Sequence, residues 1–188
     1  MTTWQLDGAH TQINFSAKHM MVTTVRGAFH DVEGTLELDE TDPTRSHGEF
    51  RVAAASIDTN FAARDTHLRS ADFFDVENHP WISFRSTAVR AARGDTFEVD
   101  GDLTIRGVTR PATFTVELEG IVPGMGGGRH VGLSAKARIA REDWGLTWNV
   151  ALEGGGWLVS KDINLEIEIA ADEVVTPVAV AAEVALAG

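Results

Sequence analysis

Strict alternation of apolar and polar residues in the segment 97–119 constrains the fold of this chain more than any other feature. One alternating run ends before Gly107, and a second begins after Pro111. A period of two residues places apolar side chains on one face of a strand and polar side chains on the other. The segment therefore predicts two antiparallel strands joined by a short turn, with one dry face and one wet face.

The same alternation occurs in six further segments, which brings the predicted number of strands to eight. Turn signals rich in Gly, Pro and Asp separate these segments. The predicted strands occupy residues 13–19, 32–38, 48–54, 82–88, 97–105, 112–118, 131–139 and 163–169.

One interval departs from the strand pattern. Between Asn60 and Asp75 the apolar residues fall at helical spacing, which predicts a short helix. Asn60 is the predicted N-cap of this helix, and Asp65 and Arg69 form a supporting pair four residues apart. The fold is therefore all-β with short helical insertions.

Length and composition exclude several classes of function. The chain has 188 residues, enough for one domain with a sizeable core. Its net charge of -12 argues against a nucleic-acid partner and against electrostatic attraction to an anionic bilayer. The chain has no cysteine, which excludes disulfides, thiol catalysis and Cys-based metal sites. We expect no stable membrane insertion.

The two ends of the chain carry separate expectations. Residues 1–7 have neither a basic start nor an apolar run, so we expect a cytoplasmic protein. Residues 1–170 form the predicted domain. Residues 171–188 form an Ala- and Val-rich tail, expected to be a helix or strand that packs on the body or on a second copy. A homodimer is thus one expected assembly.

Eight antiparallel strands hide their edges best by closing into a single barrel. Such a barrel is either filled by side chains or holds one slender ligand. Small residues at inward positions favour the hollow form, because large dry voids are destabilising unless a ligand fills them. The alternative is a sandwich with the small residues opposite larger ones. The small residues at inward positions are Ala17, Gly34, Ala54, Ser86, Ala88, Gly101, Ala135 and Ala137.

Several ordered sequence blocks carry a resemblance to a known family. They are Trp4-x-x-Asp7-x-x-His10-x-x-Ile13-x-Phe15, Lys18-His19-Met20, Gly27-x-Phe29, Ser56-Ile57-Asp58-Thr59, Arg64-Asp65-x-His67-Leu68-Arg69-Ser70, Asp72-Phe73-Phe74-Asp75, Pro80-x-Ile82-x-Phe84-x-Ser86-Thr87, Gly101-Asp102-Leu103-Thr104-Ile105-Arg106-Gly107-Val108-Thr109 and Arg141-x-Asp143-Trp144-Gly145-Leu146-x-Trp148. From Trp4 to about Ile169 the chain resembles the YceI-like, polyisoprenoid-binding proteins. The resemblance implies an extended, lipocalin-like antiparallel barrel whose hydrophobic tunnel holds an isoprenoid or a similar amphiphilic lipid. It implies no catalytic activity.

Strand parity identifies most of the residues expected to line the tunnel, and Trp144 and Trp148 are added because aromatic rings beside Gly145 could pack along a prenyl chain. For Trp144 and Trp148, packing beneath a loop is the alternative. The predicted lining comprises Phe15, Ala17, Phe29, Leu36, Phe84, Leu103, Phe114, Leu133, Ala135, Trp144 and Trp148.

Three side chains are the predicted contacts of the lipid head group. His19 has inward parity at the end of its strand, and its alternative role is a buried histidine bonded to a backbone carbonyl. Arg64 offers planar, bidentate donors, and its alternative is an ion pair that pins the helix to the barrel rim. Arg26 is a candidate of the same kind as Arg64.

Three hypotheses of function follow. The first is a carrier of an isoprenoid such as a quinone or a polyprenyl phosphate, with a small-molecule lipid as its partner and no cofactor. The second is a lipid-modifying enzyme that uses the luminal His19, and the third is a filled-barrel interaction or stress protein. Asp75, Glu77 and His79 resemble a metal cluster but show no further ligands, so we expect no metal site. We expect a binding protein and not an enzyme.

Overall fold

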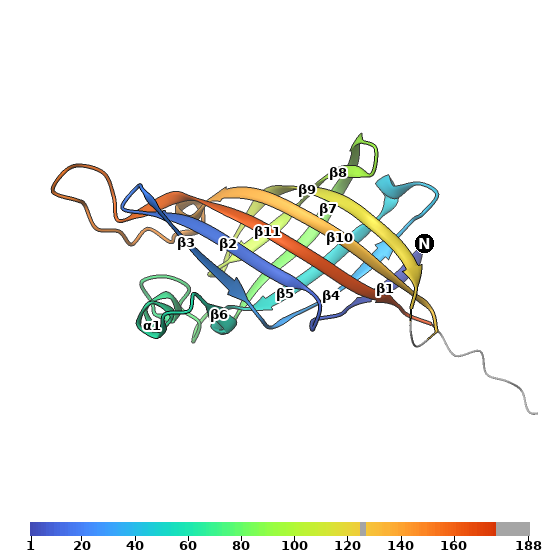
Figure 1. Cartoon of the computed structure of the whole chain (residues 1–188), viewed down its shortest axis with the longest axis horizontal. Coiled ribbons are helices and arrows are strands. Elements are labelled where there is room, and N and C mark those ends of the chain that lie inside the picture. Colours follow the sequence, from blue (N-terminus) through green and yellow to red (C-terminus); the bar gives the residue numbers. More distant parts are fainter. Residues whose placement is uncertain (125–126, 176–188) are drawn as a thin grey trace, which may run out of the picture.

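The computed structural model describes residues 1–124 and 127–175 as one antiparallel sheet curled into a barrel (Figure 1). The strands follow the order β1-β4-β5-β7-β8-β9-β10-β11-β2-β3-β6, and β1 also pairs with β11. This pairing closes a ring of eight strands and confirms the predicted all-β barrel. The strands are β1 (Thr2–Leu6), β2 (Gln12–His19), β3 (Thr23–Phe29), β4 (Val32–Leu38), β5 (His47–Ala53), β6 (Ile57–Asp58), β7 (Trp81–Arg93), β8 (Thr96–Ile105), β9 (Val108–Pro123), β10 (Arg129–Ala140) and β11 (Val159–Glu173).

All eight predicted strands are present, and three short ones were not predicted. β1 is only five residues long, and β6 only two, so neither displays a period. In β3, Gly27 and Ala28 interrupt the alternation. β1 is one of the eight strands of the closed ring. β2, β3 and β6 lie outside the ring and continue the sheet from β11.

Strand β11 holds the ring together through both of its edges. One edge pairs with β10 along nearly the whole strand. The other edge pairs with β2 over residues 159–168 and with β1 over residues 171–173. The barrel thus extends three residues past the domain boundary predicted at residue 170. The predicted structure of the tail beyond residue 175 lies outside the described residues.

Three inward glycines make room for phenylalanine rings and not for a ligand. A Cβ atom at Gly101 would lie 2.5 Å from the carbonyl oxygen of Arg85 and closer still to the Phe84 ring. The rings therefore lie against bare backbone, a known way of supporting glycine in a strand. The pairs are Gly27 with Phe15, Gly34 with Phe50 and Gly101 with Phe84.

Other small residues also depart from their predicted inward positions. The register of β7 shifts between Ser86 and Ala88, so Val89 faces the barrel interior and Ala88 is exposed. Such a bulge reverses the parity of every residue that follows it. Ala54 lies buried in a 3-10 turn, Ala54–Ser56. Ala137, by contrast, keeps its inward parity, because it pairs with Leu165, which lines the cavity.

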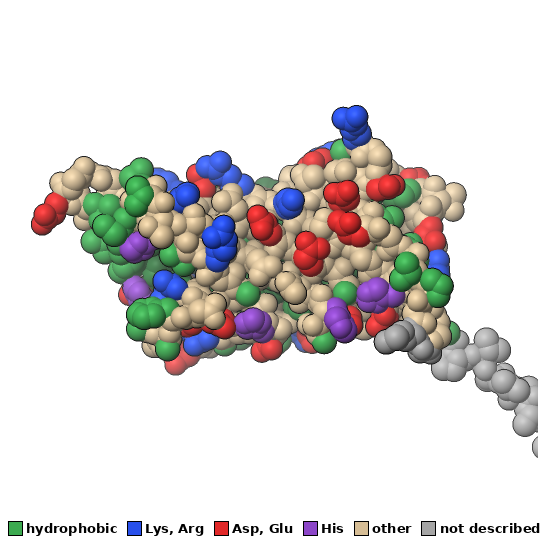
Figure 2. Space-filling model, viewed as in Figure 1, with side chains coloured by type: hydrophobic (Ala, Val, Ile, Leu, Met, Phe, Trp, Pro, Cys, Tyr) green, Lys and Arg blue, Asp and Glu red, His purple; other side chains and the backbone are tan. Residues whose placement is uncertain are grey.

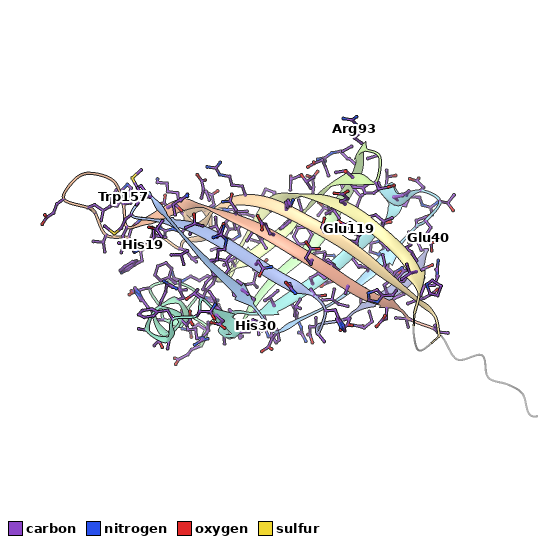
Figure 3. All side chains as sticks on the ribbon, viewed as in Figure 1. His19, His30, Glu40, Arg93, Glu119 and Trp157 are labelled. Atoms are coloured by element: carbon purple, nitrogen blue, oxygen red, sulfur yellow. The ribbon has the colours of Figure 1, made fainter. Side chains whose placement is uncertain are left out.

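The two ends of the barrel differ in chemical character. His19 and Trp157 lie at the end that carries helix α1 (Ala62–Arg69), and Glu40 lies at the end that carries β1 (Figure 3). Acidic and basic side chains are spread over the outer wall, whereas hydrophobic side chains gather at the α1 end (Figure 2).

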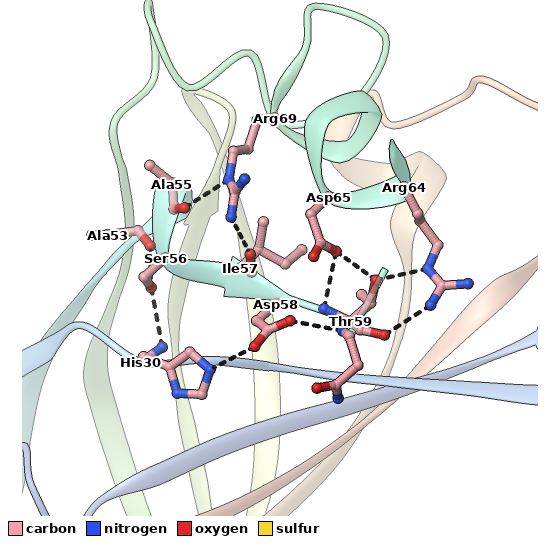
Figure 4. Close-up of polar contacts among 11 residues, drawn as sticks. His30, Ala53, Ala55, Ser56, Ile57, Asp58, Thr59, Arg64, Asp65 and Arg69 are labelled. Carbon is pink, nitrogen blue, oxygen red and sulfur yellow. Dashed lines mark hydrogen bonds and ion pairs between the residues drawn. The ribbon is translucent and has the colours of Figure 1, made fainter. Parts of the chain in front are cut away.

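The N-cap of helix α1 lies one residue later than predicted. Phe61 occupies the N-cap position without a side-chain hydrogen bond, and Asn60 adopts a left-handed conformation with φ of 58°. The predicted pairing of Asp65 with Arg69 is also wrong. Arg69 instead donates to the backbone oxygens of Ala55 and Ile57 (Figure 4).

A buried carboxylate attaches α1 to the barrel. Asp65 is 6% exposed and accepts hydrogen bonds from the backbone N–H of Thr59, at 2.9 Å, and from the Thr59 hydroxyl (Figure 4). Arg64 donates to the hydroxyl and to the backbone oxygen of Thr59, at 2.7 and 2.8 Å. Thr59 directly follows β6, so these bonds fix the helix across one end of the sheet.

Replacing Gly101 with alanine should destabilise the barrel. The new Cβ would collide with the Phe84 ring and the Arg85 carbonyl oxygen. We expect the free energy of unfolding in urea to fall by about 1–3 kcal/mol, as for other overpacked interiors. Gly132→Ala is the matched control, because its Cβ would meet only the Cβ of Glu119, at 3.6 Å. Equal losses in both variants would contradict the collision.

Replacing Asp65 with alanine should loosen the attachment of α1. The substitution leaves the buried N–H of Thr59 without its acceptor, which costs about 1–3 kcal/mol. Denaturant titration measures this loss. Thr66→Ala is the control, because Thr66 is exposed and bonds only within the helix. A change below about 0.5 kcal/mol in Asp65→Ala, the range of ordinary surface substitutions, would show that the carboxylate is dispensable.

Candidate functional site

A cavity of about 970 Å³ lies inside the barrel. Its lining includes Leu38 and His47 near the β1 end and Val25 and Arg64 near the α1 end, so it extends along the barrel. The volume is at the upper end of the range of about 300–1,000 Å³ for small-molecule sites. The inward side chains of the strands form its wall because side chains alternate between the two faces of a sheet.

Ten of the eleven predicted tunnel residues line this cavity. The strand β11 adds four aliphatic side chains of the same alternating kind, Ile163, Leu165, Ile167 and Ile169. The predicted residues found in the lining are Phe15, Ala17, Phe29, Leu36, Phe84, Leu103, Phe114, Leu133, Ala135 and Trp148. Their contact with a lipid stays a prediction.

Trp144 is the exception and packs beneath the wall. It lies in the 3-10 turn Arg141–Trp144, is 3% exposed, and donates from Nε1 to the backbone oxygen of Leu103 at 2.9 Å. This is the alternative expected for Trp144, packing beneath a loop. Trp148 does reach the cavity, where its ring lies 4.6 Å from that of His67 and 5.3 Å from that of Phe73.

Polar donors gather where the cavity reaches the α1 end. His19 and Arg64 both line it there, as their predicted head-group role requires, and His67 joins them. Arg64 is anchored by Thr59 and lies over the Phe61 ring at 5.5 Å, so hydrogen bonds take the place of the alternative ion pair. His67 Nε2 is bonded to the Asp72 carboxylate at 2.9 Å, so His19 and Arg64 are the side chains that can donate to an electronegative group in the mouth of the cavity.

Arg26 does not reach the cavity. It is exposed on the outer face of β3, beside Asn14, Asn164 and Glu166. β3 was not predicted from the sequence, so the parity of Arg26 could not be assigned. The structure gives this arginine no place at the mouth.

Arg141 is a lining residue that the sequence analysis missed. It is 4% exposed and donates from Nε to the backbone oxygen of Ser160 at 3.0 Å and from Nη1 to that of Leu146. Its Nη2 is buried and has no partner among the described residues. Burial lowers the pKa of its guanidinium, but arginine stays charged. Its position two residues beyond Ile139, at the same inward parity, was the available signal.

The opposite end of the cavity is acidic. Asp39 and Glu40 line it there. Arg129 pairs with Glu40 at 2.8 Å and with Glu173 at 2.9 Å, and its guanidinium lies 5.2 Å from the ring centre of Trp4. Hydrogen bonding by Arg129 lowers the pKa of the Glu173 carboxyl. The α1 end of the lining thus has Lys18, His19, Arg64 and His67. The other end has His47 and two carboxylates, each paired with an arginine, Asp39 with Arg45 and Glu40 with Arg129.

Two further features concern metal sites and membrane spans. Among residues 1–124 and 127–175, no group of three His, Asp or Glu side chains is arranged to hold a metal ion. Asp75 and His79 approach within 4.0 Å in a turn, without Glu77 as a third member. Within the described part of the chain, no helix has the length and apolar character to cross a membrane.

Sequence comparison finds relatives that match nearly the whole chain. UPF0312 proteins of Staphylococcus aureus, among them those of strains N315 and MW2, are 36% identical over 167 residues. The matched region covers 88% of this chain and 95% of each relative.

Solved structures share the barrel. The YCEI protein of Campylobacter jejuni is 28% identical, with a TM-score of 0.73 over 84% of this chain and 90% of that one. Burkholderia cenocepacia BcnA is 20% identical, with a TM-score of 0.75 over 88% and 98%. A domain from Saccharophagus degradans, described as a polyisoprenoid binding domain, is 13% identical, with a TM-score of 0.66 over 93% and 100%. The last two show the fold alone.

The YceI-like domain matches residues 4–171, which take in every strand that closes the barrel. The blocks of sequence that suggested this resemblance lie within the match, and the observed barrel is the one it implied. The chain belongs to the YceI-like family.

Proposed function

We propose that this protein binds a long-chain amphiphilic lipid, with the hydrocarbon tail inside the barrel. The cavity of about 970 Å³ with aliphatic and aromatic walls carries this proposal. Each Å² of apolar surface removed from water contributes about 25 cal/mol, less the cost of ordering the tail. A flexible tail matches a long, narrow cavity better than a compact ligand does.

The polarity of the cavity supports one orientation of the lipid. His19 and Arg64 offer donors at the α1 end, and Arg141 adds a fixed positive charge to the cavity wall. At the other end Arg45 and Arg129 are already paired with the carboxylates of the lining, so they are less available to a head group. The head group therefore lies at the α1 mouth, and the tail points toward β1.

An isoprenoid is the proposed lipid, such as a quinone or a polyprenyl phosphate. Membership of the YceI-like family supports this class, as does the description of the Saccharophagus degradans neighbour as a polyisoprenoid binding domain. The phosphate oxygens or the quinone carbonyl would accept hydrogen bonds from the histidine and arginine side chains.

The proposed role is binding and carriage without chemistry on the lipid. A reaction needs an acid or base within hydrogen-bond reach of the reacting atoms. The titratable side chains of the lining, among them His19 and Glu40, lie toward its two ends, and the wall between them is mainly hydrocarbon. A hydrocarbon tail in this middle section would therefore contact only apolar side chains.

Solvent extraction of the purified protein, followed by mass spectrometry, tests the proposal directly. We expect about one isoprenoid per protein chain, because one cavity of this shape accommodates one slender ligand. A fatty acid or fatty amide would keep the tunnel and overturn the isoprenoid assignment. An extract without lipid, from protein made in its own host, would contradict lipid binding.

Replacing Ala135 with phenylalanine should block the tunnel without unfolding the barrel. Ala135 is 4% exposed and lines the cavity, so a ring there would occupy the path of the tail. We expect affinity for a prenyl lipid to fall about tenfold or more, a loss of at least about 1.4 kcal/mol. Fluorescence titration measures it, with thermal unfolding as the check on folding.

Lys136→Phe is the control for this variant. It adds the same ring to the neighbouring, outward-facing position of β10. Unchanged binding in a folded Ala135→Phe protein, or an equal loss in both variants, would show that the tail does not pass this point.

A further inference from the structure

Two β-hairpin tips lie side by side at the α1 end of the barrel. Residues 20–22 connect β2 with β3, and residues 149–158 form a second hairpin before β11. The N–H of Met20 donates to the backbone oxygen of Leu158 at 2.8 Å, and the thioether of Met21 fills the space above Gly156. Both tips extend beyond the barrel wall (Figures 1 and 3).

These tips, together with the residue before α1, carry a concentration of exposed hydrophobic side chains. Six of the eleven large hydrophobic side chains exposed among the described residues lie here. We call these six the apolar rim. They are Met20 (50% exposed), Met21 (66%), Val22 (80%), Phe61 (58%), Val150 (45%) and Trp157 (51%). Exposed apolar groupings of this kind mark interaction surfaces.

The turn at Met20 and Met21 is unfavourable for its own backbone. Both residues are left-handed, with φ of 49° and 65°, a conformation that hairpin turns normally assign to Asn and Gly. A side chain raises the energy of this conformation. Because both methionines remain half exposed or more, folding recovers little of that energy through packing. Strain of this kind at an exposed position points to a function of the side chains.

The apolar rim adjoins the mouth of the cavity. Phe61 belongs both to the rim and to the cavity lining. Leu158 and His19, which also line the cavity, directly adjoin Trp157 and Met20 in the chain. A lipid tail that enters or leaves by this end therefore passes between the rim side chains.

The chemistry of the tips favours a neutral apolar surface over a charged one. Segments 20–22 and 149–158 together carry one charged residue, Glu153, in a chain with a net charge of -12. Electrostatic attraction to anionic lipid therefore contributes little here. Methionine and valine side chains gain by burial in acyl chains, and tryptophan favours the level of the head groups.

We propose that the apolar rim docks peripherally on the surface of a zwitterionic phospholipid bilayer, with the mouth of the barrel facing the membrane. This inference rests on the proposed function, because docking gives the lipid a path from bilayer to tunnel that avoids water. A second copy of the chain on the same rim would instead cover the mouth and close that path.

Flotation with phosphatidylcholine vesicles tests the docking. We expect the wild-type protein to float with the vesicles and binding to change little between low and high salt. Brominated phosphatidylcholine should quench Trp157, and Trp157→Phe should lose most of that quenching. A protein that stays with the aqueous fraction at all lipid concentrations would overturn the proposal.

Variants of the rim provide the second test. Met21→Glu and Trp157→Glu should each weaken vesicle binding at least about tenfold. Val122→Glu is the matched control, because Val122 is 55% exposed near the opposite end of the barrel. Equal losses in all three would overturn the assignment of the rim.

A double variant separates docking from folding. Met20→Asn/Met21→Gly supplies the residues that the left-handed turn prefers, so it should raise the thermal midpoint and yet lose vesicle binding. Retained binding in this variant would contradict a role for the methionines. Dimerisation of the wild type that disappears in Met21→Glu, without vesicle binding, would assign the rim to a second copy.

Lipid content, measured by extraction on the same samples, distinguishes this proposal from the one it rests on. A wild-type protein that holds lipid but ignores vesicles overturns docking and leaves lipid binding intact. A protein that binds vesicles but yields no lipid overturns lipid binding and leaves a membrane-docking surface.

Discussion

The barrel depends on the pairing of one long strand with neighbours on both of its edges. β11 keeps β10 on one edge and shares the other between β1 and β2. The ring therefore closes through β1 and β4 at one end, whereas at the other the hairpin of β2 and β3 reaches round to β6. That second end has no further long strand, and helix α1 lies there beside the mouth of the cavity, held by the buried bonds between Asp65 and Thr59. The place of the mouth follows from how the sheet is closed.

Hydrogen-bonded strands form the wall of the cavity, and residues at the ends of the strands supply its polar side chains. Inward side chains in the middle of each strand are mainly apolar, whereas the side chains on the opposite face meet water. Histidine, arginine and carboxylate side chains enter the lining only where strands end and turns or α1 begin. In the proposed function, different structural elements would contact the tail and the head group. Changes in a turn can alter the choice of head group and leave the tunnel wall as it is.

The sequence predicts the barrel well because each long strand has one dry face and one wet face. That condition imposes a period of two, and each of the eight segments that show this period contains a strand. The failures occur where the period stops. Trp144 lies in a turn that ends β10, Ala88 follows a bulge, and Arg26 lies in a strand whose alternation Gly27 disguises. Arg141 could have been found, because it continues the inward parity of β10, but a charged residue at an inward position was not expected.

The contact of Phe84 with Gly101 has a consequence for the order in which substitutions can accumulate. The ring fills the space that any side chain at position 101 would need, so the two positions form one structural unit. A larger residue at position 101 requires that the ring at position 84 be reduced first and that the backbone at Arg85 also shift. The reverse order passes through an intermediate with a clash. The width of the cavity beside Phe84 can therefore change in evolution if position 84 is substituted first, but not if position 101 is.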